Sequence, residues 1–413
     1  MANNPVLVVG GGIGGLAAAL TLARKGHAVR VFEQGAEFKE IGAGIQLGPN
    51  VFRMFDLLRL TGEVGRYAVQ PDHLVMMDGI TGEEVIRMPV GSAAFRARFG
   101  GLPYAVIHRA DLHRVFIDAC RAESGVDLAV SAKALRYEER GERVVLHLEG
   151  GEAIEGCALI GADGLWSRVR EQLLGDGKPR VSGHIAYRAV LPRAEVPADL
   201  WQNNVVLWAG PKTHLVQYPL RRGELLNLVA VFHSDKYEEG WDVFGDPEEL
   251  RRKFASERPE VQRLLERIDV WKMWVLCDRE PVREWSKGRV TLLGDAAHPM
   301  LQYLAQGANM AIEDAVVMAA YVELAGGDFA RAFRWYQDER YLRTARVQTT
   351  ARYYGDIYHA SGVVREVRNA FLAPKPGAGR EAKPSFEGVA WLYDGIRVPA
   401  APREDGPQDS AGA

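Results

Sequence analysis

The chain has 413 residues, of which 47% are hydrophobic and 25% are charged, and its formal net charge is −3. This composition is ordinary for a globular enzyme of about two or three domains, and the small net charge excludes electrostatic recruitment of nucleic acid or of an acidic membrane. The three cysteines, Cys120, Cys157 and Cys277, are odd in number and have no metal-ligand spacing. We therefore expect no bound metal, no disulfide framework and a cytoplasmic location. No apolar run approaches about 18 residues, so neither a membrane span nor a targeting segment is expected.

The N-terminal stretch has the pattern of a strand, a glycine-rich turn, a helix and a second strand. The continuous apolar run 6–9 predicts a buried parallel strand. Residues 14–25 are rich in alanine and leucine and predict a helix that is capped by Gly26. The next apolar run, 29–33, completes a βαβ unit of the length that dinucleotide binding requires.

The turn in this unit has the spacing G-x-G-x-x-G, with Gly10, Gly12 and Gly15 at its three positions. These glycines allow a tight turn, a close approach of backbone to a pyrophosphate and close helix–strand packing. The helix start offers unpaired N–H groups to the phosphates. The residues expected at a cofactor on this basis are Gly10, Gly12, Ile13, Gly14 and Gly15. Glu33, at the end of the second strand, is expected to accept hydrogen bonds from both ribose hydroxyls. A glycine-rich turn without a ligand is the alternative, and the motif does not separate FAD from NAD.

The stretch up to residue 178 continues with alternating helix and strand patterns. A helix is expected over 111–123, directly after Arg109. Strands are expected over 143–148 and 152–160, and the second of these leads into Asp163.

Residues 180–280 are dominated by strand-like runs, which predict an antiparallel sheet that forms a second domain. The expected strands are 185–191, 205–207, 214–220 and 225–232. Residues 221–224 separate the last two as a hairpin loop. One charged helix is expected over 246–268, with Asp246 as its N-cap and a proline in its first turn.

A second glycine-containing loop follows the buried run 290–293, where Asp295 comes next to Gly294. An aspartate at the end of a strand can bind the ribityl or ribose hydroxyls of a dinucleotide, although an N-cap without a ligand is a common alternative. Gly307, Ala308 and Asn309 then open a long helix, expected to end near residue 324. Its N-terminus would stabilise the negative charge of a reduced flavin, a need that nicotinamide lacks.

The pattern as a whole predicts an α/β fold: a Rossmann-like FAD-binding domain, an inserted and mainly antiparallel β-sheet substrate domain, and a C-terminal helical region. The boundaries expected for the discontinuous FAD-binding domain are 1–75, 102–178 and 279–345. The substrate domain is expected to comprise 76–101 and 179–278, followed by a helical region at 346–398. Residues 399–413 are rich in proline, glycine and alanine and are expected to be a disordered tail.

The two loops, together with Asp163 and the segment 167–170, resemble the single-component FAD-dependent aromatic hydroxylases, a family that includes the salicylate and para-hydroxybenzoate hydroxylases. The resemblance covers about residues 5–370. It implies that Asp163 takes part in handling FAD and pyridine nucleotide, and that Arg109 contacts the flavin side. A turn residue and a surface arginine are the respective alternatives. The further cofactor contacts expected on this basis are Gln34, Gln46 and Val130. The family often has Glu-Arg where this chain has Glu33 and Gln34, which places one contact on the adenine side in doubt.

Within the family, three stretches are most similar to enzymes that hydroxylate 3-hydroxybenzoate: 213–221, 278–281 and 300–307. Salicylate hydroxylases are very similar in the last stretch but typically have proline where this chain has Gln302. That one position is the main basis for preferring 3-hydroxybenzoate to salicylate.

His214, Val216 and Tyr218 share one face of their expected strand because strand side chains alternate. His214 is expected to accept the phenol proton, since the unperturbed imidazole pKa near 6.5 suits that task. Tyr218 and Gln302 complete the expected catalytic set, with Gln302 orienting the substrate. Tyr104 is expected in the wall of the substrate pocket. His298 is expected to orient the loop around Gly294 and Asp295, which we call the distal loop. For each of these residues a purely structural role is the alternative.

The resemblance implies a flavin cycle in which NADH or NADPH reduces FAD, O2 adds to form a C4a-hydroperoxide, and a phenolic aromatic acid is hydroxylated. NADH is the expected reductant. The expected conversion is 3-hydroxybenzoate to gentisate, and the expected assembly is a homodimer. The alternatives are a salicylate hydroxylase that forms catechol, a 6-hydroxynicotinate 3-monooxygenase, a flavin reductase or cyclase acting on an isoprenoid, and a flavin-binding protein without oxygenase activity.

Overall fold

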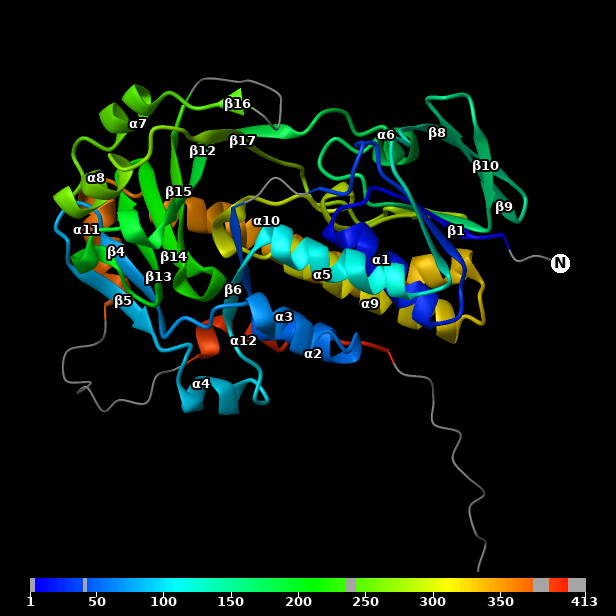
Figure 1. Ribbon diagram of the computed structural model, residues 1–413, viewed down its shortest axis with the longest axis horizontal. Coiled ribbons are helices and arrows are strands. Elements are labelled where there is room, and N and C mark those ends of the chain that lie inside the picture. Colours follow the sequence, from blue (N-terminus) through cyan, green and yellow to red (C-terminus); the bar gives the residue numbers. More distant parts are fainter. Residues whose placement is uncertain (1–3, 40–42, 235–242, 374–385, 400–413) are drawn as a thin grey trace, which may run out of the picture.

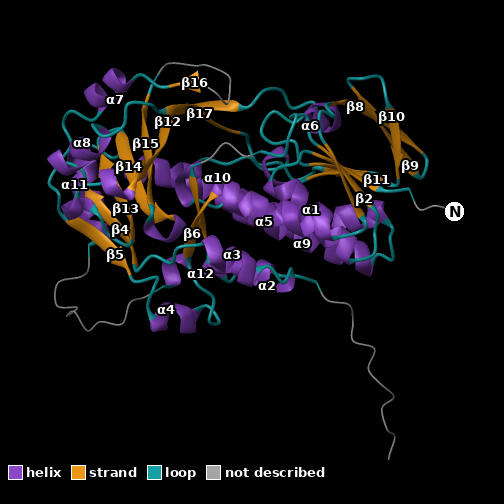
Figure 2. Ribbon diagram, in the orientation of Figure 1, coloured by secondary structure: helices purple, strands orange, loops and turns teal. Residues whose placement is uncertain are grey.

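The computed structural model describes residues 4–39, 43–234, 243–373 and 386–399. It has two main β-sheets at opposite ends, with helices between and around them (Figures 1 and 2). The mixed α/β architecture with a C-terminal helical region confirms the predicted fold class. Nearly all of the predicted disordered tail lies outside the described residues, as does the part of the helical region at 374–385.

The first main sheet has six strands, and five of them run parallel. In spatial order its strands are β18 (Ser286–Lys287), β19 (Val290–Leu292), β11 (Ala158–Gly161), β1 (Val6–Val9), β2 (Val29–Phe32) and β7 (Val126–Ala129). All four residues of β1 and of β11 are buried, as a parallel strand covered on both faces requires. The short edge strand β18 is antiparallel to β19.

Three helices pack beside one another along this sheet: α1 (Ile13–Arg24), α5 (Arg109–Ala122) and α9 (Gly307–Leu324) (Figure 1). Small and apolar residues cover nearly the whole surface of α1 and most of α9, because neighbouring elements surround both helices. Gly26 follows α1 with φ +87°, a conformation that favours glycine, and its N–H donates to the carbonyl of Ala23, as the predicted cap requires. The short helix α6 (Arg168–Leu174) follows β11.

The second main sheet has eight strands, shown at the left of Figure 1. In spatial order they are β16 (Val243–Phe244), β17 (Lys272–Asp278), β12 (Arg180–Pro192), β15 (Leu225–His233), β14 (Thr213–Leu220), β13 (Asn204–Gly210), β4 (His73–Asp78) and β5 (Glu84–Met88). Every pair is antiparallel except β13 and β4, which run parallel. The predicted β-rich domain is therefore present, and β4 and β5 join it from an earlier part of the chain.

The single helix predicted over 246–268 is wrong. The structure has two short helices instead, α7 (Pro247–Lys253) and α8 (Pro259–Leu265). Arg258 precedes Pro259 and takes an extended conformation, which a residue before proline prefers, so the helix cannot continue through it. Asp246 does cap α7, since its side chain accepts a hydrogen bond from the N–H of Glu248.

Two smaller sheets connect to the main ones. The strands β8 (Ala134–Arg140), β9 (Arg143–Leu148) and β10 (Ala153–Gly156) form an antiparallel sheet, and β3 (Gly44–Leu47) pairs with β6 (Ala105–His108). The one strand predicted over 152–160 is therefore two strands, β10 and β11, because the chain leaves the small sheet at Cys157 and enters the six-stranded sheet.

The remaining helices surround the region between the main sheets. They are α2 (Pro49–Leu57), α3 (Thr61–Tyr67), α4 (Ala93–Arg98), α10 (Phe329–Tyr358), α11 (Gly362–Leu372) and α12 (Glu387–Tyr393). The short 3-10 turns within the described residues are η1 (Arg193–Glu195), η2 (Ala198–Leu200), η3 (Arg221–Gly223), η4 (Gly294–Ala296) and η5 (Gln302–Leu304). Near its start, α10 contacts the six-stranded sheet, where Gln337 accepts hydrogen bonds from the N–H groups of Trp285 and Ser286. It ends at the eight-stranded sheet, where the N–H of Lys212 donates to the carbonyl of His359.

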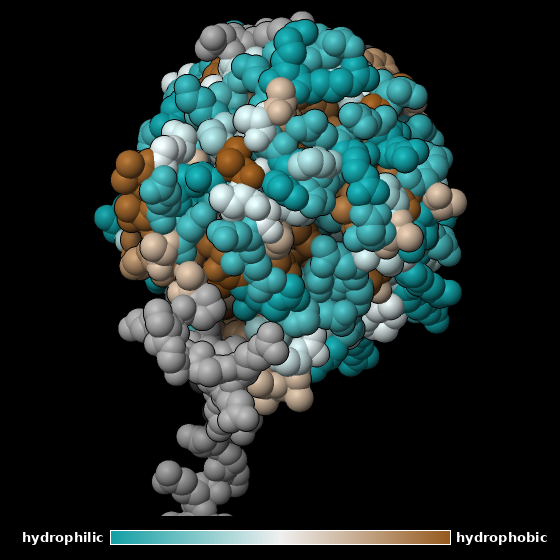
Figure 3. Space-filling view, turned by 90° about the vertical axis from the view of Figure 1, so that its left-hand side faces the viewer, coloured by the Kyte–Doolittle hydropathy of each residue, from teal (hydrophilic) through white to brown (hydrophobic). Residues whose placement is uncertain are grey.

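The end of the molecule with α8 and α11 has a mostly hydrophilic surface that hydrophobic side chains interrupt in a few places (Figure 3). On α11, the exposed hydrophobic residues are Val363, Val364, Val367 and Phe371. Among the helices of the described residues, none has the length and apolar character needed to cross a bilayer.

Candidate active site

The predicted cofactor residues collect along one edge of the six-stranded sheet, which we call the cofactor edge. It consists of the segments that follow the carboxyl ends of the five parallel strands: Val130 after β7, Glu33 after β2, Gly10 after β1, Asp163 after β11 and Asp295 shortly after β19. In open parallel sheets, ligands bind outside the carboxyl ends of the strands. Five segments that are far apart in sequence thus form one continuous binding edge.

The glycine turn at the centre of this edge is as tight as the fingerprint predicts. A Cβ atom at Gly10 would lie 2.3 Å from the carbonyl oxygen of Ala162, and φ there is +108°. A Cβ atom at Gly15 would lie 2.0 Å from the carbonyl oxygen of Gly10. Gly14 faces the distal loop instead, because its Cβ position is 2.9 Å from Leu293. The turn therefore has no room for side chains at these positions, and its backbone can approach a ligand closely.

Two helix N-termini at this edge have no side-chain cap. Gly12 is the N-cap of α1 and Gln306 is the N-cap of α9, and neither helix has an acidic residue in its first turn. Asp295 is exposed in a loop whose other residues from 290 to 299 are buried or nearly so, and its Oδ1 lies 3.7 Å from a Cβ position at Gly307. Uncapped N–H groups and a helix dipole suit the phosphates at α1 and the electron-rich edge of a flavin at α9. These residues fit a dinucleotide of the FAD type.

The adenine-side candidates lie together at one end of the cofactor edge. The carboxylate of Glu33 accepts hydrogen bonds from the N–H of Gly11 at 2.9 Å and of Gly35 at 2.7 Å, which holds it next to the glycine turn. Gln34 and Val130 are both exposed. The places of these three residues are compatible with a ribose and a base, and their contacts with the cofactor stay a prediction.

Asp163 has a clear local role beside the glycine turn. Its carboxylate accepts hydrogen bonds from the Ser167 hydroxyl and from the N–H of Arg168 at 2.7 Å, so it holds the start of α6. Next on α6, the buried Arg170 donates to the carbonyls of Ala296 and Ala297 at 2.9 and 2.6 Å. The segment 163–170 therefore fixes the distal loop, which gives a physical reason for the two motifs to occur together.

A buried charge network holds the distal loop from the other side. The His298 ring lies 2.6 Å from the Asp314 carboxylate, which also accepts from Gly294 N–H. Arg340 donates to Asp314 and Glu313, both at 2.7 Å. Burial acts to raise the pKa of Glu313, but the charges of Arg343 and Arg340 outweigh it, and the pKa lies below its ordinary value. The predicted orienting role of His298 fits this network.

Gln46 and Asn309 link the cofactor edge to the second sheet. The Asn309 amide donates to the Gln46 carbonyl at 3.1 Å, and the Tyr104 hydroxyl donates to the Gln46 side chain. A Cβ atom at Gly44 would lie 2.9 Å from the hydroxyl of Tyr218. The predicted pocket residue Tyr104 and the predicted catalytic residue Tyr218 therefore meet around strand β3.

One face of the eight-stranded sheet, which we call the inner face, points toward this junction. Across three neighbouring strands, Arg188, Val229 and Val216 lie side by side, and Asn227 lies opposite Tyr218. The segment with η5 covers this face, since Leu301, Tyr303 and Leu304 pack against Val216 and Val229. The predicted catalytic residues His214, Tyr218 and Gln302 are thus brought to one face.

The environment of His214 differs from the one that its unperturbed pKa implies. The side chain is 2% exposed, and burial lowers its pKa to about 3. Its Nδ1 lies 2.7 Å from Nε2 of His359, and its ring centroid is 5.5 Å from that of Tyr303. His214 is therefore neutral before a ligand binds and offers its ring as a hydrogen-bond partner.

Arg188 is the main functional candidate that the sequence did not reveal. Its guanidinium donates to the side-chain oxygen of Gln302 and stacks 5.3 Å from the ring centre of Trp274. Burial lowers its pKa to about 10, which leaves it cationic at neutral pH. Arg188 lies in a strand that has both polar and apolar residues and no recognisable motif. Its role becomes visible only from the residues that lie next to it in the folded sheet.

Two buried donors on the inner face have no hydrogen-bond partner within the described part of the chain: Nε of Arg188 and Nδ2 of Asn227. Asn227 uses its oxygen to accept from the N–H of Gly44 at 2.7 Å. A buried unpaired donor is costly unless a ligand satisfies it. Because an ionised carboxylate only accepts hydrogen bonds, an acidic ligand matches both donors.

Comparisons with known proteins agree with the fold and with FAD as the cofactor. Residues 3–349 match the family model described as FAD binding domain. The chain is 47% identical over 392 residues to 3-hydroxybenzoate 6-hydroxylase of Polaromonas naphthalenivorans, covering 95% of this chain and 96% of the relative. Among solved structures, Klebsiella pneumoniae HpxO complexed with FAD and uric acid superimposes with a TM-score of 0.79 at 26% identity, covering 91% and 94% of the two chains. A salicylate hydroxylase substrate complex gives 0.78 at 25% identity, covering 97% and 99%.

The fold, the cofactor edge and the match over nearly the whole chain lead to the same family. FAD is the cofactor, and the enzyme is a flavin-dependent aromatic monooxygenase. The chain belongs to the FAD binding domain family and, within it, to the FAD-dependent aromatic hydroxylases.

Proposed function

We propose that this monooxygenase converts 3-hydroxybenzoate to gentisate, by hydroxylating the carbon para to the existing hydroxyl. The observation that carries the proposal is the 47% identity over 95% of the chain to an enzyme of that name. The inner face supports it, because a cation and two unpaired donors suit the carboxylate of an aromatic acid. When bound, FAD accepts electrons from NADH or NADPH and transfers one oxygen atom from O2 to the aromatic ring.

In this proposal, residues of the inner face bind and activate the ring. Arg188 and Asn227 hold the carboxylate through the donors that lack partners. His214 hydrogen-bonds the ring oxygen and favours its phenolate form, which makes the ring more electron-rich. Because burial lowers the pKa of the imidazole, His214 does this as a neutral hydrogen-bond partner and not as a cation.

Tyr218 and Tyr104 form one wall of the proposed pocket. Both side chains are nearly fully buried, and burial raises the pKa of each, so both hydroxyls stay protonated and act as donors. The apolar residues Leu220, Met310 and Val106 lie in the same cluster and exclude water. Exclusion of water favours oxygen transfer to the ring over release of H2O2.

Salicylate is the second candidate substrate, because a salicylate hydroxylase shares the fold over nearly the whole chain. Gln302 favours 3-hydroxybenzoate, since its side-chain oxygen accepts a hydrogen bond from Arg188 that the proline typical of salicylate hydroxylases cannot accept. A 6-hydroxynicotinate 3-monooxygenase stays the third alternative.

The test is a substrate panel followed by identification of the product. Purified protein should be yellow, and 3-hydroxybenzoate should accelerate both NADH oxidation and O2 uptake, with gentisate as the product. Catechol from salicylate, without gentisate, would show that the substrate is wrong and the family right. NADH oxidation without any hydroxylated product from the panel would favour a flavin-binding protein that is not an oxygenase. The preference for NADH, the homodimer, the cytoplasmic location and the domain boundaries stay predictions.

A further inference from the structure

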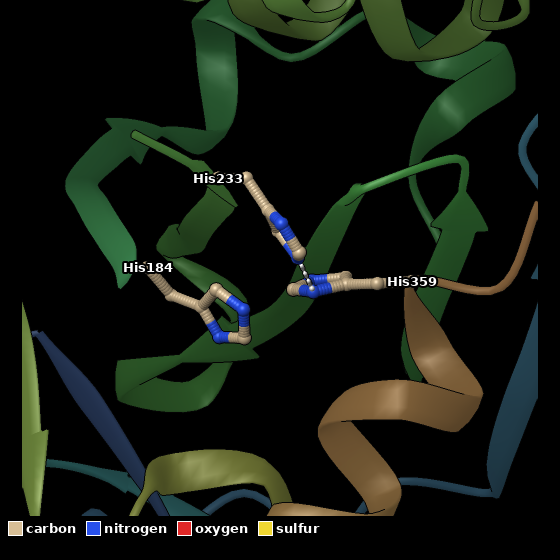
Figure 4. Close-up of side chains that lie close together, drawn as sticks. All are labelled: His184, His233 and His359. Atoms are coloured by element: carbon tan, nitrogen blue, oxygen red, sulfur yellow. Dashed lines mark hydrogen bonds between the residues drawn. The ribbon is translucent and has the colours of Figure 1, made fainter. Parts of the chain in front are cut away.

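Three histidines from distant parts of the chain meet beside the inner face. His184 lies in β12, His233 is the last residue of β15, and His359 is the C-cap of α10. Each offers one ring nitrogen, and these three atoms all lie within 4.8 Å of one another. Figure 4 shows the three rings turned toward a common space. No spacing in the sequence indicated this cluster, because its members come from two strands and a helix end.

Two of the nitrogens already have the separation of ligands on one metal ion. Nε2 of His233 lies 3.1 Å from Nδ1 of His359. Zinc binds imidazole at about 2.0–2.1 Å, so two ligands in tetrahedral geometry lie roughly 3.3 Å apart. Because the three nitrogens lie within 4.8 Å of one another, His184 needs a shift of at most about 1.5 Å to complete the set, which a side-chain rotation supplies.

The outer nitrogens of two ligands have the partners that metal sites require. The Nδ1 atom of His184 is hydrogen-bonded to the hydroxyl of Tyr303, and Nε2 of His359 lies 2.7 Å from Nδ1 of His214. A metal-bound histidine almost always donates its other N–H to such an acceptor, which fixes the ring orientation. These bonds leave Nε2 of His184 and Nδ1 of His359 available to an ion.

The charge state and the access also suit a cation. Neutral histidine is the commonest metal ligand, because its ring has one free lone pair. His184 and His233 are only half-buried, so the cluster is open to solvent. Near His233, the charges of Lys212 and Lys253 oppose a cation, and that of Asp356 favours it.

We propose that His184, His233 and His359 bind one divalent transition-metal ion of the zinc, nickel or copper class. Three imidazoles without a carboxylate or thiolate exclude magnesium and calcium, which prefer oxygen, and suit these ions. One coordination position stays open for water. The ion would join β12, β15 and the end of α10. His359 would then donate its Nε2–H to Nδ1 of His214, and His214 would present its own Nε2–H to the ring oxygen of the substrate.

The test measures metal content and therefore does not depend on hydroxylase activity. Tag-free holoprotein is stripped with EDTA, dialysed against buffered zinc and analysed for zinc and protein. Wild type and the control His147→Gln, whose histidine lies on the small β8–β10 sheet, should each bind one zinc per chain. The double variant H184Q/H233Q should bind none at the same free zinc. Tyr303→Phe, which removes a partner of a ligand, should weaken zinc binding by about 10- to 100-fold.

Thermal unfolding gives a second readout on the same samples. Zinc should raise the melting temperature of wild type and of His147→Gln, and leave that of the double variant unchanged. Wild-type protein that takes up no zinc overturns the proposal without any variant. Equal zinc uptake by wild type and the double variant also overturns it, because the ion then binds elsewhere and the three histidines form only a hydrogen-bonded stack.

Discussion

The cofactor edge and the inner face are built in opposite ways. The cofactor edge is made of backbone: glycines without side chains, two uncapped helix ends and a few acids at strand ends. The inner face is made of side chains from strands that pair across the sheet, such as Arg188, Asn227 and His214. A site made of backbone can be predicted from a local sequence motif. A site made of side chains from several strands exists only after the sheet has formed. The first region therefore suits a cofactor common to a family, and the second suits a substrate that differs among its members.

The largest effect is expected where the cofactor edge loses its backbone surface. Gly10→Ala places a methyl group against the carbonyl of Ala162 at a φ that favours glycine, so FAD should be lost and the unfolding free energy should fall by about 3 kcal/mol. Flavin absorbance of the purified protein and urea unfolding measure both. Gly65→Ala is the control, because Gly65 lies inside α3 with no atom within 4 Å of its Cβ position. A yellow Gly10→Ala protein of wild-type stability would show that the edge tolerates side chains.

The next effect separates chemistry from cofactor binding. His214→Gln should reduce the rate of product formation by about 10²- to 10⁴-fold, the usual contribution of a positioned acid–base group. FAD content and flavin reduction by NADH should stay close to wild type, since His214 lies on the inner face and not on the cofactor edge. Rapid-mixing absorbance gives the reduction rate, and chromatography gives the product. Unchanged product yield would remove His214 from its proposed role.

Arg188→Met tests whether the inner face selects an acid. Loss of a charged hydrogen bond should raise KM for 3-hydroxybenzoate by about 10- to 100-fold, corresponding to roughly 1.5–3 kcal/mol. The neutral analogue 3-hydroxybenzyl alcohol should lose little, so the preference for the acid should nearly disappear. Arg193→Met is the matched control, since Arg193 follows the same strand but stacks on Trp201, 4.3 Å from its ring centre. An equal effect on acid and alcohol would assign Arg188 to packing.

How much the sequence predicted follows from this contrast. The glycine turn, the two helices that open at the cofactor edge and the central strands of both sheets come from local patterns, and the structure has them in place. The strands β4, β5, β7 and β17 were not predicted. Gln302 was identified only through resemblance, and Arg188 and Asn227 not at all, because their role depends on which strands become neighbours. The same limit explains the error at 246–268, where the helical composition outweighed the effect of Pro259 on the residue before it.

The last effect concerns stability alone, with no expected change in activity, and it depends on a buried acid behind the second sheet. Glu313 and Asp314 in the cofactor domain are paired with Arg340. Among the described residues, the Glu257 carboxyl has only the Thr213 hydroxyl as a hydrogen-bond partner, and burial raises its pKa to about 7. Protonated Glu257 is therefore favoured in the folded state, and its contribution to stability, complete below about pH 4.5, is lost as the pH rises to about 7. Urea unfolding should show wild type losing up to about 3 kcal/mol relative to Glu257→Gln between pH 4.5 and 8. Parallel pH profiles for the two proteins would contradict the raised pKa.

The helix α10 connects the two regions physically. Gln337, near its start, is bonded to the backbone beside β18, and its C-cap His359 is bonded to β14 through His214. A helix of 30 residues is about 45 Å long and resists bending, so a shift at one end moves the other. A chimera that combines this flavin domain with the eight-stranded sheet of another protein should therefore also take the last turn of α10 from that protein. Otherwise the end of the helix and the strand that it contacts would not fit each other.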